Sequence, residues 1–74
     1  MYLHEAIECV IRQNRNTWMS PDEITDAVND GKLFRRKRDG GPVRRNQVSA
    51  RLSNHRHTFE QNDQGEWRIR PDKA

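Results

Sequence analysis

The chain has 74 residues, of which 31% are hydrophobic and 34% are charged, and its formal net charge is +3. This length allows a single domain with a small core, which we place at residues 1–70 before a polar tail at 71–74, and excludes a deep catalytic cleft. The single cysteine excludes an internal disulfide, and no stretch approaches the ~20 apolar residues of a membrane span. We therefore expect a cytoplasmic protein that has no membrane partner.

The modest net charge conceals a strongly cationic centre. Residues 32–56 carry nine lysines and arginines against Asp39 alone, a local charge of +8. Residues 1–31 carry −4 and residues 57–74 carry −1. Clustered cations act on a partner through their summed field, and the usual polyanionic partner of a small domain is a nucleic-acid backbone. A solvated charged loop is the alternative interpretation.

The first 19 residues predict a helix followed by a short extended segment. Apolar side chains recur at the spacing of one helical face, and the helix ends near Asn14. These side chains are Leu3, Ile7, Val10 and Ile11. Residues 17–19 (Thr-Trp-Met) favour β-structure and are too short to stand alone, so we expect them to pair with a later strand.

A second helix is predicted from its capping signals. Ser20 is a suitable N-cap, Pro21 occupies the first helical position, and Glu23 completes a capping box. We expect Gly31 to end the helix in a left-handed conformation, after which Leu33-Phe34 returns to the core. The buried face is formed by Ile24, Ala27 and Val28.

The basic centre divides into a loop and a third helix. We expect residues 35–41 to form a charged loop that ends in glycines, and residues 44–54 to be helical. Asn46 is a possible N-cap if the helix starts late. Val48 and Leu52 lie one turn apart and are expected to face the core.

The last segment predicts a β-hairpin. Residues 58–61 and 66–70 alternate apolar and polar side chains, and the four residues 62–65 form a polar turn. The side chains predicted to share one face are Phe59, Trp67 and Ile69. We expect both Trp18 and Trp67 to be core or core-edge residues rather than platforms for base stacking.

The order of helix, short strand, helix, loop, helix and hairpin predicts an α+β fold, a small winged helix-turn-helix. Several segments resemble the HARE-HTH family of winged helices, found in the bacterial RNA polymerase delta subunit, restriction systems and chromatin proteins. The segments are LHEAIECV (3–10), MSPDEI (19–24), GKLF (31–34), QVSARL (47–52), Phe59 and GEWRI (65–69). They cover nearly the whole chain but are mostly core and capping positions. The resemblance implies DNA binding, as proposed for many members, or an RNA polymerase partner, as in the delta subunit.

The third helix supplies the candidate DNA-binding residues. Its residues opposite Val48 and Leu52 are Asn46, Gln47, Ala50, Ser53 and Asn54, with Ser49 and Arg51 on the flanks. Amides pair with adenine edges, serine serves as donor or acceptor, and alanine allows close approach to the groove floor. Arg44 and Arg45, at the positive end of the helix dipole, suit phosphate or guanine.

Two further sets of cations are candidates for the phosphate backbone. Arg35, Arg36, Lys37 and Arg38 would add salt-dependent affinity through counterion release. Arg68 and Arg70 on the hairpin are weaker candidates, because the tip of this wing carries Asp63.

The sequence shows no catalytic or cofactor signature. His4, Cys9, His55 and His57 have no metal-binding spacing. We interpret the two later histidines as an exposed turn, and the alternatives are a proton switch or a phosphate contact. We expect no enzymatic activity, metal, cofactor or small-molecule substrate. The leading hypothesis is a regulatory domain that binds double-stranded DNA, with the third helix in the major groove and the basic loop on the phosphate backbone. Such a protein would be associated with the nucleoid. The alternatives are RNA, or docking on RNA polymerase or another protein through the charged faces.

Overall fold

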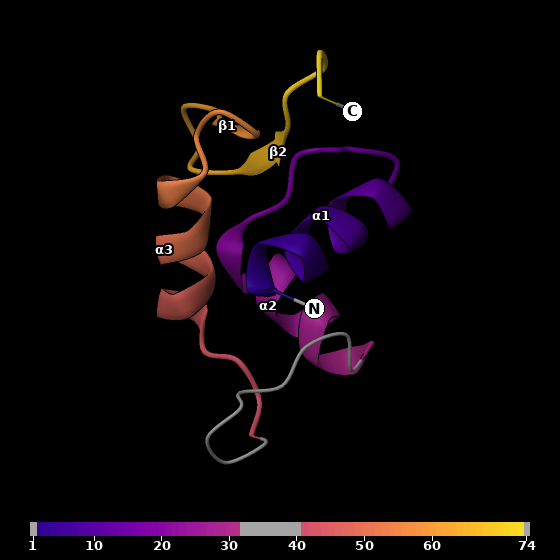
Figure 1. The fold of residues 1–74 in the computed structure, drawn as a ribbon, viewed down its shortest axis with the longest axis vertical. Helices are drawn as coiled ribbons and strands as arrows, with labels where there is room; N and C mark the ends of the chain where they lie inside the picture. The colour runs from indigo at the N-terminus through magenta and orange to yellow at the C-terminus, as the bar shows by residue number, and fades with distance from the viewer. Residues whose placement is uncertain (1, 32–40, 74) are drawn as a thin grey trace.

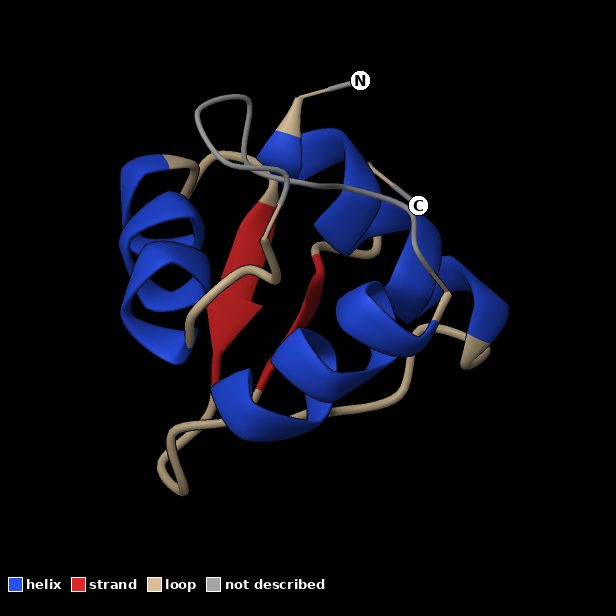
Figure 2. Ribbon diagram, turned by 90° about the horizontal axis from the view of Figure 1, so that it is seen from below, coloured by secondary structure: helices blue, strands red, loops and turns tan. Residues whose placement is uncertain are grey.

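The computed structural model describes residues 2–31 and 41–73, which form three helices and two strands. In chain order they are α1 (Leu3–Gln13), α2 (Pro21–Asp30), α3 (Arg45–Asn54), β1 (Phe59–Gln61) and β2 (Trp67–Ile69). The helices pack on one another and α1 also packs against β2 (Figures 1 and 2). This is the predicted α+β class in the arrangement of a small winged helix.

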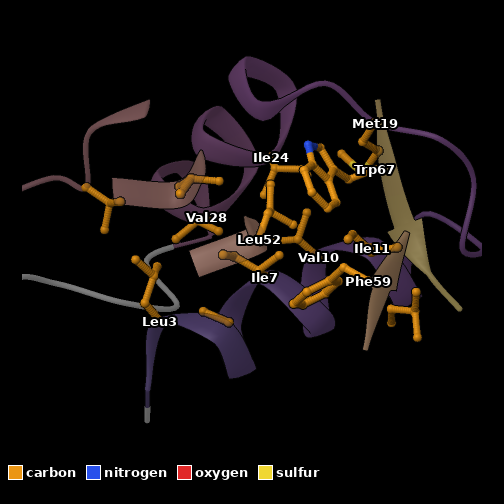
Figure 3. Packing of buried hydrophobic residues seen from close by; sticks show 14 residues of the cluster. Leu3, Ile7, Val10, Ile11, Met19, Ile24, Val28, Leu52, Phe59 and Trp67 are labelled. Atoms are coloured by element: carbon orange, nitrogen blue, oxygen red, sulfur yellow. The ribbon is translucent and has the colours of Figure 1, made fainter. Parts of the chain in front are cut away.

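One core joins all five elements (Figure 3). Each helix contributes an apolar stripe, and both strands direct their apolar side chains into the same cluster. The largest fully buried members are Phe59, Ile7, Ile11, Ile24, Leu52 and Ile69. Trp67 is buried and Trp18 half-buried, as predicted for core and core-edge residues. The apolar surface hidden by this cluster is the main force holding α3 against the rest of the domain.

The end of α1 uses an unusual turn. Arg15 and Asn16 adopt left-handed φ angles of 59° and 55°, although neither is glycine. The Asn16 amide compensates, because the Ile69 N–H donates to its Oδ1 at 2.8 Å and its Nδ2 donates to the Ile69 carbonyl at 2.9 Å. The side chain thereby satisfies backbone groups of β2 that a third strand would otherwise pair.

The predicted cap of α2 is confirmed at its start and wrong at its end. The Glu23 N–H donates to Ser20 Oγ, and the Ser20 N–H donates to the Glu23 carboxylate, both at 3.1 Å. Gly31 is right-handed (φ −79°, ψ −7°), because its N–H still donates to the Ala27 carbonyl and continues the helical turn. Ile24 and Val28 are buried and Ala27 is partly buried. The predicted return of Leu33-Phe34 lies outside the described residues.

A second asparagine fixes the start of α3. The Val43 N–H donates to Asn29 Oδ1 at 2.9 Å, and Asn29 Nδ2 donates to the Val43 carbonyl at 3.0 Å. Asn29 belongs to α2 and Val43 directly precedes Arg44, the N-cap position of α3. The contact therefore sets where α3 begins, and Asn46, in the helix, is not its N-cap.

The predicted hairpin is confirmed, although its strands are shorter than predicted. β1 and β2 are antiparallel, with Phe59 opposite Ile69. The turn closes through the Asn62 N–H and the Glu66 carbonyl at 2.9 Å, and Gly65 takes the left-handed conformation at φ 79°. Of the predicted 17–19 segment, only Met19 pairs, through two hydrogen bonds with Trp67.

Residues 71–73 form a turn in which the Lys73 N–H donates to the Arg70 carbonyl at 2.8 Å. Among the described residues, no helix has the length and apolarity needed to cross a membrane.

Candidate nucleic-acid interface

The outer face of α3 is exposed and has no apolar side chain larger than alanine. Val48 and Leu52 are fully buried, as predicted, and they fix the rotation of the helix. The outward residues are Asn46, Ala50, Ser53 and Asn54, all exposed. Figure 1 shows α3 at one edge of the molecule with its long side away from the other elements. We use the term α3 face for these four residues.

Gln47, predicted to point outward, has a local structural role. Its Oε1 accepts a hydrogen bond from the Arg44 N–H at 3.0 Å, and the side chain is half-buried. A backbone donor at the start of a helix lacks an intrahelical partner, so this contact stabilises the end of α3. The same carbonyl oxygen is therefore already occupied.

The flank of α3 nearest α2 and the hairpin is polar and nearly neutral. Arg45 Nε lies 2.9 Å from the Asp22 carboxylate, and both side chains remain largely exposed. Ser49 and Ser53, one turn apart, line a groove of about 360 Å³ beside this ion pair. The other residues lining the groove are Ser20, Pro21, Asp22, Arg45, Gln61, Gln64, Gly65 and Trp67. Because Asp22 offsets Arg45, this flank attracts phosphate less than the sequence predicted.

The opposite flank carries Arg51 and a stack of aromatic rings. The centroids of His4 and His55 are 4.4 Å apart with nearly parallel planes, and those of His55 and His57 are 5.6 Å apart. Tyr2 extends the stack at 5.7 Å from His4. We call His4, His55 and His57 the histidine stack. It joins the N-terminal end of α1 to the C-terminal end of α3.

The surroundings of His55 disfavour its protonated form. Burial lowers the pKa of His55 below its usual value, and the positive charges of His4, His57 and Arg51 lower it further. Glu8 on α1 acts in the opposite direction. At neutral pH, His55 is therefore predominantly uncharged.

The hairpin arginines are engaged within the domain. Arg68 Nε donates to the Glu60 carboxylate at 2.6 Å, and its guanidinium lies over the Trp18 ring at 4.4 Å from the centroid. Arg70 Nε donates to the Arg56 carbonyl at 2.6 Å. Both arginine side chains therefore have structural roles within the domain. Arg68 and Arg70 contribute less to a DNA interface than the sequence alone suggested.

The predicted phosphate-binding residues Arg35, Arg36, Lys37 and Arg38 lie outside the described residues. Arg44 is described and exposed at the start of α3. In the part of the chain that the structure describes, no group of histidine, cysteine or carboxylate side chains has a metal-binding arrangement.

Sequence reasoning left two features of this surface out of its candidate site. Arg51 was placed on a flank and not among the DNA contacts, although it is exposed in the middle of α3. The histidine stack was missed, because His4 is 51 positions from His55 in the chain and only the packing of α1 on α3 joins them.

Comparison with family models, with curated proteins and with solved structures found no match for this chain.

Proposed function

We propose that this chain is a winged-helix domain that binds double-stranded DNA through the α3 face, with no catalytic role. The observation that carries the proposal is the chemistry of that face. Asn46, Ser53 and Asn54 offer donors and acceptors to solvent around the small Ala50. Residues of these types can recognise base edges in a major groove, which is wide enough to admit an α-helix.

The geometry of α3 suits this task. A helix of 10 residues is about 15 Å long, which is comparable with the ~12 Å width of the major groove. Its inward side is fixed by Val48 and Leu52, and its start is fixed by the Asn29–Val43 hydrogen bonds. A helix held at both places can enter a groove without first losing conformational freedom.

The charges beside the face suit a DNA backbone. Arg44 at the start of α3 and Arg51 along it are exposed, and they belong to the segment whose local charge is +8. Arginines at the start of a recognition helix and along one side of it lie near a strand that borders the groove, where they neutralise phosphates. The basic residues 35–38 are part of the same proposal as sources of affinity. The proposal agrees with the resemblance to the HARE-HTH family, and it includes a location in the cytoplasm.

The test is a fluorescence anisotropy titration of a labelled random duplex at low salt. We expect binding that weakens steeply with salt, because each neutralised phosphate releases counterions. Replacing both Arg44 and Arg51 with alanine should reduce the salt slope by about two, one per lost contact. The double replacement of Arg12 and Arg15 with alanine is the charge-matched control, because both arginines lie at the end of α1 that is away from α3 (Figure 1).

The following results would overturn the proposal. One is the absence of duplex binding at low salt. The other is an equal loss of affinity in the double variant and in two-charge controls away from α3, which would indicate unspecific attraction by net charge. Binding to duplex RNA with the same affinity would also exclude insertion of α3, because the major groove of RNA is too narrow and deep.

A second candidate function rests on the acidic side of the molecule. The carboxylate side chains of α1 and α2 that are exposed are Glu5, Asp22, Glu23, Asp26 and Asp30. Such a surface suits a basic patch on a protein such as RNA polymerase. Recovery of a stoichiometric protein partner that survives nuclease treatment, and is lost when Asp26 and Asp30 are changed to asparagine, would favour this alternative.

A further inference from the structure

We propose that the histidine stack and Arg51 form a binding site for a backbone phosphate of the duplex, and that this site takes up a proton when the phosphate binds. The inference rests on the proposed function, and it extends the DNA interface from the α3 face to the N-terminal end of α1. It also makes the affinity for DNA dependent on pH.

The first argument is position. His55 directly follows α3, and its N–H donates to the carbonyl of Arg51 at 3.1 Å. Residues four apart lie on the same side of a helix, so Arg51 and His55 share the flank that faces α1. A strand of DNA bordering the groove occupied by α3 would pass along such a flank.

The second argument is composition. The chain contains three histidines, and ring contacts join all three in this one stack. Imidazoles are the side chains whose charge changes between about pH 5 and 8. All the positive charge that histidines can add to this chain is therefore located at one end of the proposed interface. This part of the surface includes His57, which is exposed.

The third argument is the local balance of charge. The ionic groups that act on His55 are Glu8 from α1, Arg51 from α3, and the two neighbouring imidazoles. Glu5 also lies in the first turn of α1, where its carboxylate accepts the Tyr2 N–H at 2.8 Å. With neutral imidazoles, the Glu8 carboxylate offsets the charge of Arg51, so the site attracts phosphate only weakly. Each proton added to the stack shifts this balance toward a cationic site.

Phosphate and proton therefore help each other to bind. In the free protein, burial and the adjacent positive groups oppose protonation of His55. A phosphate placed against the rings would supply the negative charge that offsets this opposition. By linkage, a ligand that raises the pKa of a group binds more tightly when that group is protonated.

The test measures duplex affinity and individual histidine titrations. Between about pH 8 and about pH 5.5 we expect affinity to rise about tenfold at constant ionic strength, the effect of a pKa raised by about one unit. NMR titration of the imidazole C–H signals should show a higher pKa for His55 with the duplex than without it. Replacing all three histidines with glutamine should reduce the change in affinity to less than about twofold.

His57→Gln alone provides a variant that is safe for folding, since His57 is exposed. It should reduce the rise in affinity between about pH 8 and about pH 5.5 to a value between those of the unmodified domain and of the histidine-free variant. Two results would overturn this inference and leave the proposed function standing. In the first, the domain binds the duplex at pH 8 but its affinity does not rise at lower pH. In the second, the affinity of the histidine-free variant rises by the same factor. Absence of duplex binding at every pH would overturn both.

Discussion

Replacing Asn29 with alanine tests how α3 is fixed to the rest of the domain. The substitution removes both hydrogen bonds to Val43, at 2.9 and 3.0 Å, and leaves two backbone groups of a buried residue without these partners. At about 0.5–1.5 kcal/mol net for each bond, the loss is about 1–3 kcal/mol. The higher helix propensity of alanine offsets up to about 0.7 kcal/mol. Taking about 2 kcal/mol for the two bonds, we therefore expect a net destabilisation of about 1.5 kcal/mol.

Such a loss is large for this domain and easy to measure. At about 0.05–0.15 kcal/mol per residue, a 74-residue chain has a total stability of about 4–11 kcal/mol. Thermal unfolding followed by circular dichroism should show a Tm lower by about 6–12 °C. Urea unfolding should show a lower midpoint with an unchanged slope, the sign of a stability change alone.

Two variants isolate the hydrogen bonds from other effects. Asp26→Ala changes an exposed residue on the same helix and corrects for helix propensity. Asn29→Asp keeps an acceptor for the Val43 N–H but places a second oxygen against the Val43 carbonyl, so it should destabilise at least as much as alanine. A corrected loss below about 0.5 kcal/mol for Asn29→Ala would refute the role given to this contact.

Three further predictions follow from single contacts. Gly65→Ala should lower the stability by about 1–2 kcal/mol, because Gly65 is left-handed (φ 79°), although a Cβ there meets only Gln61 Nε2 at 3.8 Å. Gly31→Ala, at φ −79°, should be neutral or stabilising. Equal changes in Tm for the two variants would contradict the left-handed conformation of Gly65 as the cause. The pKa of His55 is lowered in the folded state, so the unfolded chain binds the proton first as pH falls. Stability present above about pH 6.5 should therefore decline below it, and urea midpoints that are as pH-dependent in His55→Gln would exclude this residue as the cause. Asp22→Asn should change stability by less than about 1 kcal/mol, because its ion pair with Arg45 is exposed, yet strengthen duplex binding about twofold by removing a nearby negative charge. Anisotropy titration measures this effect, and weaker binding would place Asp22 among the contacts instead.

The elements that local chemistry determines were predictable from the sequence. Ser20, Pro21 and Glu23 specify the start of α2 through contacts within four residues, and the structure has both expected hydrogen bonds. The inward positions Val48 and Leu52 follow from helical spacing alone, and they determine which residues of α3 remain outside.

The misjudged features depend on contacts between distant residues. Local preference assigns a left-handed conformation to Gly31, yet the structure uses it at Arg15 and Asn16, where the Asn16 amide bonds Ile69, 53 positions away. Arg45 looked available for phosphate until α2 placed Asp22 beside it. Arg68 was likewise counted as a wing cation before the hairpin register set it against Glu60. A charge count cannot show such pairing.

The most direct test of the proposed DNA-binding role is an NMR titration of the labelled domain with a short random duplex at low salt. We predict that backbone and side-chain amide signals of α3 shift, those of Asn46 and Asn54 most, while signals of the exposed carboxylate-bearing side of α2 stay in place. No shifts at low salt, or shifts centred on Asp26 and Asp30 instead of the α3 face, would contradict the proposal.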